Sequence, residues 1–386
     1  MRVLHIITGL AVGGAELQVR LLMKNTRHQA DVLCLYNPST VAEMIEQDGG
    51  TVRNLEMRSN TQIWAVWRLR QIIRRGGYDV VHVHLYRACL YGRFAAWLAR
   101  TPVIVTSEHS IGETHIERRK MTLGVRALYL ATDVFSDATI AISDAVRDRL
   151  VKWGVPRRKL VEIPNGLDFG GLGYDPDART LSRKQFGIDQ DAYVLGVMGR
   201  LDPGKRIDLA IEAAAPLLGD GCKFLVVGTG DDRDRLVAAA ERCGVADHVI
   251  FAGYQPDSAA MLSTMDLYVS TSAQEAFGLS ILEALANGMP ALFTACPALD
   301  GITTDRALKV SGNVDELRAE IAREVAAGHR PRLSVPEVAE QYGIESVAAQ
   351  VDALYDRLRH GRHRQAHVND VPMVVSTHEP VDQRAS

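Results

Sequence analysis

The chain has 386 residues with a formal net charge of −3 at pH 7, and 47% of its residues are hydrophobic. This length is sufficient for two ordinary domains with a large core, and the nearly balanced charge does not indicate nucleic acid as a partner. None of the five cysteines has CxxC spacing, which argues against a zinc site or a disulfide framework and favours reduced thiols in a cytoplasmic enzyme.

The first expected element is a strand over residues 2–7, followed by a glycine loop and a helix. The stretch VLHIITGLAVGGA resembles a short signal peptide, but His5 and Thr8 interrupt its apolar run. The next residues, AELQVRLLMKN, continue as a helix with leucines on one stripe. We therefore favour a buried strand, and no stretch of the sequence is long and apolar enough to be expected to span a bilayer.

Strands and helices are expected to alternate along most of the chain. The expected strands lie at 2–7, 31–36, 79–84, 103–107, 139–143, 160–164, 193–199, 223–228, 248–253, 266–270 and 290–294. The expected helices include 61–75, 143–153, 205–218, 231–243 and 279–287. Short apolar strands separated by amphipathic helices predict parallel sheets covered on both faces, and therefore an α/β fold.

The alternation pauses between residues 165 and 190, where Gly, Asp and Arg are frequent, and this predicts a domain boundary. Residues 1–168 and 169–343 are expected to form two Rossmann-like, doubly wound domains. A helix at about 344–360 is expected to pack back on the first domain, and the polar residues 361–386 are expected to lack fixed structure. Because ligands of such sheets gather at the carboxyl ends of the strands, functional residues are expected directly after strands.

Residues 199–206, GRLDPGKR, nearly match a Walker phosphate-binding loop, but Arg206 occupies the position of the magnesium-binding Ser or Thr. Arg200 and Lys205 could instead clamp a diphosphate without a metal; a pair of surface cations is the alternative. A nicotinamide dehydrogenase has little support, because neither the loop around Gly13 and Gly14 nor GTGDDRD (228–234) contains the dinucleotide fingerprint. The glycine pair fits equally a close approach to an anion or a tight turn.

The segment EAFGLSILE, residues 275–283, contains two glutamates with seven residues between them, around the start of a helix. Glu275 is expected on the loop and Glu283 within the helix. The amides of residues 277–280 would face an anion along the helix dipole. A carboxylate such as Glu283 is suited to accept hydrogen bonds from a ribose diol. The competing interpretation is a solvated glutamate pair on a helix.

Three histidines near strand ends need separate consideration. His82 and His84 form an HxH pair that supplies metal ligands in some hydrolases, but no further ligand motif accompanies it, and a structural or substrate-lining role is favoured. His109 directly follows the next strand, where either a functional residue or an ordinary loop histidine fits. Trp64 and Trp67, with four arginines in 61–75, could touch a membrane surface; a helix packed on the sheet is favoured, and 115–130 is a second, weaker candidate for contact with an acceptor or lipid.

Together these motifs resemble the retaining GT-B glycosyltransferases of family four, the "glycosyl transferases group 1" type. The resemblance rests on the glycine pair, the histidine after a middle strand, PNGLD at the boundary, GRLxPxK and EAFGLSILEALANGMP, and it extends from about residue 1 to about residue 355. It implies two domains facing across a cleft, with the acceptor on the N-terminal side and the nucleotide-sugar donor held mainly by the C-terminal domain. The loop TACPALDGIT (294–303) departs from the family pattern, which puts its contacts with the donor in doubt.

The resemblance also implies roles for individual residues. The implied catalytic residues are His109, Arg200, Lys205 and Glu275. The implied donor-binding residues are Gly13, Gly14, Phe277, Gly278, Leu279 and Glu283. Neither a metal nor a cofactor is expected.

The implied activity is transfer of a sugar from a UDP-, GDP-, ADP- or dTDP-linked donor to a hydroxyl of a sugar, glycolipid or small molecule, with retained anomeric configuration. Polysaccharide, glycolipid or natural-product synthesis is the expected context, in the cytoplasm, with membrane contact no closer than peripheral at the inner face. The alternatives are a nucleotide-sugar 2-epimerase on the same fold, a non-catalytic sugar-nucleotide binding protein, and a metal-dependent hydrolase built on His82 and His84.

Overall fold

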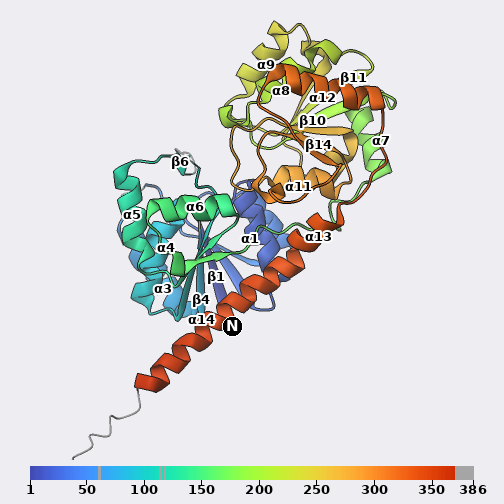
Figure 1. Ribbon diagram of the computed structural model, residues 1–386. Helices are drawn as coiled ribbons and strands as arrows, with labels where there is room; N and C mark the ends of the chain where they lie inside the picture. The colour runs from blue at the N-terminus through green and yellow to red at the C-terminus, as the bar shows by residue number, and fades with distance from the viewer. Residues whose placement is uncertain (60–61, 113–114, 117–118, 370–386) are drawn as a thin grey trace, which may run out of the picture.

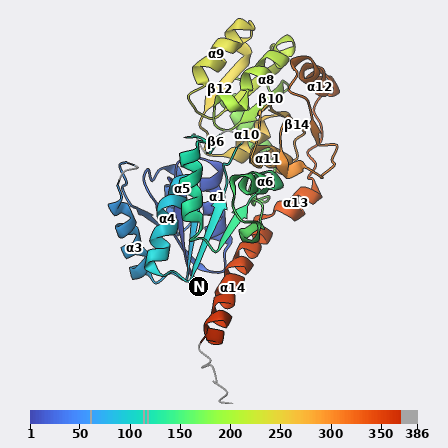
Figure 2. The same cartoon turned by 60° about the vertical axis from the view of Figure 1, so that its left-hand side comes forward.

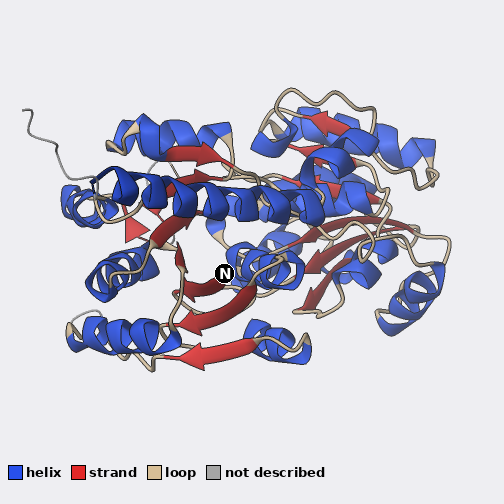
Figure 3. Ribbon diagram, turned by 90° about the horizontal axis from the view of Figure 1, so that it is seen from below, coloured by secondary structure: helices blue, strands red, loops and turns tan. Residues whose placement is uncertain are grey.

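Two α/β domains and a long C-terminal helix form the computed structural model, which describes residues 1–59, 62–112, 115–116 and 119–369. Figure 1 shows the first domain in blue to green, the second in green to orange, and the last helix in red running back along the first domain. Seen from below, helices flank the strands of both sheets (Figure 3). None of the helices in the described ranges has the length and apolar composition needed to cross a membrane.

The N-terminal sheet has seven parallel strands in the order β3-β2-β1-β4-β5-β8-β9. The strands are β1 (Arg2–Ile7), β2 (Gln29–Cys34), β3 (Thr51–Asn54), β4 (Val80–His84), β5 (Val103–Glu108), β8 (Ala138–Ala141) and β9 (Leu160–Glu162). The central strands are buried on both faces, which explains why they are rich in Val and Ile. The edge strand β3 is mostly exposed and lacks such a run, so the sequence pattern did not predict it.

Helices cover both faces of this sheet. They are α1 (Gly14–Asn25), α2 (Thr40–Gln47), α3 (Trp64–Gly76), α4 (Tyr86–Ala99), α5 (Leu123–Asp133) and α6 (Asp144–Trp153), with a short hairpin of β6 (His115–Ile116) and β7 (Arg119–Lys120) and the 3-10 turn η1 (Arg157–Lys159). Helix α3 buries Val66 and Leu69, as expected for a packed helix. Trp64 and Trp67 nevertheless remain 46% and 55% exposed.

The C-terminal sheet has six parallel strands in the order β12-β11-β10-β13-β14-β15. The strands are β10 (Tyr193–Met198), β11 (Cys222–Val227), β12 (Val249–Gly253), β13 (Leu267–Ser270), β14 (Ala291–Phe293) and β15 (Ala307–Lys309). The helices are α7 (Pro176–Gln185), α8 (Ile207–Ala214), α9 (Arg233–Arg242), α10 (Ser258–Thr264), α11 (Leu279–Ala286), α12 (Val314–Ala327) and α13 (Pro336–Tyr342), and the 3-10 turns are η2 (Pro203–Lys205), η3 (Ala215–Leu217), η4 (Ala246–His248) and η5 (Pro297–Leu299). Two doubly wound parallel sheets confirm the predicted α/β fold.

The segment expected to be a linker contains helix α7, which is fastened to the C-terminal domain. Asp175 caps the helix by accepting hydrogen bonds from the amides of Asp177 and Ala178 at 2.9 and 3.0 Å. Arg183 is fully buried, and its Nη2 lies 2.8 Å from Oδ2 of Asp266. Because a buried charge needs a partner, this pair holds α7 on the second domain.

Helix α14 (Ile344–Asn369) crosses back to the N-terminal domain (Figures 1 and 2). Its Tyr355 is buried, with Oη 2.6 Å from Nδ1 of His82 on β4. Its Asp352 accepts hydrogen bonds from Thr26 Oγ1 at 2.6 Å and from the amide of Arg27 at 2.9 Å. The helix ends at Asn369 and therefore includes nine residues past 360, in the part of the chain expected to lack structure. Residues 370–386 lie outside the described residues.

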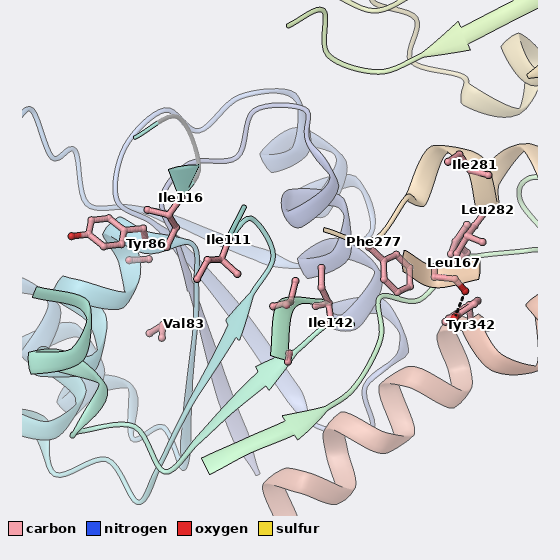
Figure 4. Packing of buried hydrophobic residues seen from close by; sticks show 14 of the residues in the cluster. Val83, Tyr86, Ile111, Ile116, Ile142, Leu167, Phe277, Ile281, Leu282 and Tyr342 are labelled. Carbon is pink, nitrogen blue, oxygen red and sulfur yellow. Dashed lines mark hydrogen bonds between the residues drawn. The ribbon is translucent and has the colours of Figure 1, made fainter. Parts of the chain in front are cut away.

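One hydrophobic cluster continues from the first domain into the second. Figure 4 shows Phe277 of the second domain beside Ile142 of the first and Tyr342 of α13. The rings of Phe277 and Tyr342 meet edge to face with centroids 5.3 Å apart. Phe277 is only 4% exposed, so the segment that carries the two glutamates is anchored at the seam between the domains.

Candidate active site

The order of strands in each sheet reverses at one point, between β1 and β4 in the first sheet and between β10 and β13 in the second. In doubly wound sheets, ligands bind at the carboxyl ends of the strands beside such a point. Gly14 follows β1, Lys205 follows β10 and Glu275 follows β13. The topology therefore places three of the predicted site segments at the two switch points.

The loop 199–206 is held in one shape by its own polar groups and by β13. The carboxylate of Asp202 accepts hydrogen bonds from the amide of Gly204 at 3.0 Å and from Nε of Arg200 at 3.2 Å. Thr271, just after β13, donates its hydroxyl to the carbonyl of Arg206 at 2.7 Å. Arg200 remains 57% exposed, so its guanidinium can reach a ligand at little energetic cost.

Lys205 and Glu275, predicted independently from two motifs, are in direct contact. Nζ of Lys205 lies 2.6 Å from Oε1 of Glu275, and the side chains are 30% and 15% exposed. The backbone of the two loops is joined as well, because the amide of Ala273 donates to the carbonyl of Gly204 at 2.9 Å. This ion pair places a fixed cation and an anion at the carboxyl ends of β10 and β13 in the second sheet.

Helix α11 begins beside this pair with its first turn uncapped by any side chain. Its N-cap, Gly278, has φ of +105°, a conformation that glycine adopts readily and other residues do not. A Cβ at this position would lie 2.4 Å from Sγ of Cys296. The chain thus reaches the helix through a turn that only glycine fits, and the positive end of the helix dipole is directed toward the loop that carries Glu275.

We expect Gly278→Ala to destabilise the protein by about 2–4 kcal/mol, because it combines an unfavourable φ with a clash against Cys296. Gly301→Ala is the matched control, since Gly301 also has positive φ (+88°) but has no atom within 4 Å of an added Cβ. Urea unfolding should show a loss of about 1 kcal/mol for the control. Equal losses for the two variants would contradict the close packing at Gly278.

Glu283 lies about one turn from the start of α11 and is partly buried. Desolvation raises its pKa to about 7. Tyr268 of β13 is nearby: burial raises its pKa, and the negative charges of Glu283 and Glu275 add to the rise. Tyr268 also donates its hydroxyl to the carbonyl of Met198 at the end of β10, at 2.9 Å. The sequence did not mark Tyr268 as a site residue, because an aromatic residue within an apolar strand is typical of a core.

The glycine loop of the first domain meets α11 of the second. A Cβ on Gly14 would lie 3.0 Å from Cδ1 of Leu279, so a larger residue would require the end of the Leu279 side chain to shift. Nearby, the hydroxyl of Ser143 donates to the carbonyl of Ala276 at 2.7 Å. Gly13 has φ of −171°, which any residue can adopt, so its backbone shows no requirement for glycine.

His109 follows β5, at the same edge of the first sheet as the glycine loop. Its Nε2 lies 3.1 Å from Nδ1 of His84, and burial lowers its pKa to about 4, so its ring is neutral at neutral pH. His82 and His84 are completely buried, which agrees with a structural role for the HxH pair. Together with His5 they offer nitrogens within 4.8 Å of one another, a spacing at which a metal ion could be held.

The loop 294–303, which departs from the family pattern, supports the start of α11 from behind. The amide of Ala298 donates to the carbonyl of Phe277 at 3.0 Å, and Sγ of Cys296 lies 3.5 Å from the same carbonyl. Tyr342 donates its hydroxyl to the carbonyl of Ala298 at 2.6 Å. This loop therefore acts on the candidate site through the backbone of Phe277.

Comparison with known proteins agrees with this architecture. The family model "Glycosyltransferase Family 4" matches residues 12–170, and "Glycosyl transferases group 1" matches residues 178–329. The chain is 26% identical over 360 residues to EpsF of Bacillus subtilis (strain 168), which carries a provisional assignment as a glycosyltransferase; the match covers 89% of this chain and 93% of EpsF. It is 31% identical over 251 residues to a D-inositol 3-phosphate glycosyltransferase of Geodermatophilus obscurus, covering 58% of this chain and only 53% of that protein.

A solved structure shares the fold. Anabaena Alr3699/HepE, crystallised with UDP and glucose, superposes with a TM-score of 0.80 at 21% identity, covering 92% of this chain and 100% of that chain. The two family models match one domain each and together span most of the chain. The chain therefore belongs to the GT-B glycosyltransferases, in the family of the glycosyl transferases group 1.

Proposed function

We propose that this glycosyltransferase moves a sugar from a nucleoside-diphosphate sugar to an acceptor hydroxyl with retention of anomeric configuration. The observation that carries the proposal is the Lys205–Glu275 ion pair, 2.6 Å between Nζ and Oε1, beside the uncapped start of α11. A leaving diphosphate gains negative charge as the bond to the sugar breaks. Fixed cations and helix amides stabilise that charge without a metal ion.

Each predicted residue has a role in this proposal. Arg200 and Lys205 hold the diphosphate, and Glu283 accepts hydrogen bonds from the ribose hydroxyls. Glu275, with the amides of residues 277–279, positions the sugar and its phosphates. Gly13 and Gly14 bring the backbone of the first domain close to the donor, and His109 lies beside the reacting sugar.

The proposed chemistry needs no nucleophilic side chain. Glu275 is already paired with Lys205, and the low pKa of His109 leaves it neutral. In a front-face route, the acceptor oxygen attacks the anomeric carbon on the side from which the phosphate leaves. The departing phosphate oxygen takes the acceptor proton, and the charges balance without a covalent enzyme intermediate.

UDP-sugars are the first donors to test, since the Anabaena protein was crystallised with UDP and with UDP-glucose. GDP-, ADP- and dTDP-sugars complete the panel. The acceptor is a sugar, a glycolipid or a small molecule, bound on the side of the first domain. We propose a cytoplasmic enzyme that needs no metal and has at most peripheral membrane contact.

The test is a donor panel ranked by thermal shift and then by release of nucleoside diphosphate with candidate acceptors. Proton NMR of the product gives the anomeric coupling, and inversion would contradict the proposed route. A 2-epimerase would convert the donor with no acceptor present, and a binding protein would show saturable binding without turnover. Chelator should change the rate little; strong inhibition would favour a metal-dependent reaction.

A further inference from the structure

Three histidines from three parallel strands form a continuous chain of hydrogen bonds that ends at the candidate site. Nδ1 of His5 on β1 lies 3.0 Å from Nε2 of His84 on β4. Nδ1 of His84 lies 3.1 Å from Nε2 of His109, directly after β5. The rings of His84 and His109 are stacked, with centroids 5.4 Å apart. His5 and His84 are 2% and 0% exposed.

The three rings are neutral, and this restricts where their protons can lie. Burial lowers the pKa of His5 and of His109 to about 4, and lowers the pKa of His84 well below its usual value. A neutral imidazole has one N–H, and its other nitrogen accepts. In each of the two contacts, one nitrogen must donate and the other must accept.

Only two arrangements satisfy both contacts. If Nε2 of His109 donates to Nδ1 of His84, then Nδ1 of His84 carries no proton. Nε2 of His84 must then donate to Nδ1 of His5, and the proton of His5 is on its Nε2. If the two hydrogen bonds run in the opposite direction, all three protons are on Nδ1. Any mixture leaves one contact with two protons or with none, which costs a buried hydrogen bond.

We propose that His84 and His5 are positioning residues that set the tautomer of His109, so that the three rings share one tautomer and switch together. The consequence concerns Nδ1 of His109, the nitrogen on the side away from His84. It presents a lone pair in one arrangement and an N–H in the other, so the side chain of Asn165, which hydrogen-bonds with His109, would meet a different partner in each. This role in the reaction rests on the proposed function, whereas the tautomer coupling does not.

Neighbouring groups pack against the three histidines but take no part in the hydrogen bonds that join them. The ring of His82 is tilted against the ring of His84, with centroids 4.1 Å apart. The nitrogens of His82 pair elsewhere, with Tyr355 Oη at 2.6 Å and Ser107 Oγ at 2.8 Å. A metal held by His5, His82 and His84 is the competing use of the same nitrogens. It would require His84 to give up one of its two imidazole partners.

The first test is the wild-type protein, labelled with 15N-histidine and examined by long-range 1H–15N correlation spectra. Single substitutions of His5, His84 and His109 assign the signals. We expect His5, His84 and His109 to show the same tautomer. Different tautomers among the three, a charged ring at pH 7.5, or a chelator-dependent 15N shift at His84 would each overturn the proposal.

The second test separates the two contacts of His84. The amide of Asn overlays Nδ1 of His and that of Gln overlays Nε2, so His84→Asn keeps the contact with His109 and loses His5, whereas His84→Gln does the reverse. Because an amide can donate or accept, both variants should release the His109 tautomer into a mixture. We expect kcat to fall about tenfold, with the donor KM changing less than about twofold.

Tyr355→Phe is the matched control, because it deletes the buried hydrogen bond between Tyr355 and His82, which lies in the same cluster but does not join His5, His84 and His109. It should leave both the His109 tautomer and kcat unchanged. If His109 keeps a single tautomer in both His84 variants, the coupling is absent. If the His109 tautomer changes in the His84 variants but the wild-type protein transfers no sugar from any donor, the tautomer coupling stands and the proposed function fails. If either His84 variant does not fold, the wild-type spectra still decide.

Discussion

Lys205→Ala is expected to lower kcat by about a hundredfold to a thousandfold, the usual loss when one preorganised charge-stabilising donor is removed. The fold should persist, because Lys205 is 30% exposed and an ion pair of that exposure typically contributes about 1 kcal/mol or less. Steady-state release of nucleoside diphosphate gives kcat, and the melting temperature reports the fold. A rate close to that of the wild type would refute the diphosphate clamp.

Two further variants make this result specific to the clamp. Lys309→Ala removes a lysine of the same domain that is 64% exposed and lies 3.9 Å from Asp300; it should leave kcat unchanged. Lys205→Arg keeps the charge but changes its geometry, and should recover part of the rate. If Lys309→Ala were equally damaging, overall charge would explain the loss better than local contact.

Glu283→Gln is expected to stabilise the free protein at pH 8 and to weaken donor binding. Desolvation raises the pKa of Glu283 from 4.5 to about 7 in the folded protein. Between about pH 4.5 and 7, the folded state therefore holds a proton that the unfolded chain has lost, so stability falls as pH rises. Glutamine cannot ionise, and the variant should gain about 1–3 kcal/mol at pH 8 and almost nothing at pH 4.

The cost of Glu283→Gln should appear when the donor binds. A carboxylate accepts two hydrogen bonds from a ribose diol, whereas an amide offers one acceptor oxygen, so the donor KM should rise about tenfold or more. Denaturant titrations at pH 4 and pH 8, with and without donor, separate the two effects. A variant that is less stable at pH 8 without donor would show that Glu283 is structural.

The parallel sheets and the motifs were accessible from the sequence because their signals are local. Valine-rich runs such as DVVHVH are typical of a strand buried on both faces, and Gly278 lies next to the helix that it starts. Arg200, Lys205 and Glu275 were likewise named from motifs that follow strands, and Glu283 from its place in the helix that follows Glu275. Edge strand β3 was missed because a mostly exposed strand has no apolar run.

Contacts between distant segments were decided only by the tertiary structure. The sequence placed Lys205 and Glu275 after strands, but strand order made β10 and β13 neighbours and joined the two side chains. Likewise, His5, His84 and His109 are separated by up to 104 positions and have no shared motif. They are adjacent because β1, β4 and β5 are successive strands of one sheet. Local patterns depend on a few neighbouring residues, whereas such pairings depend on how the whole sheet assembles.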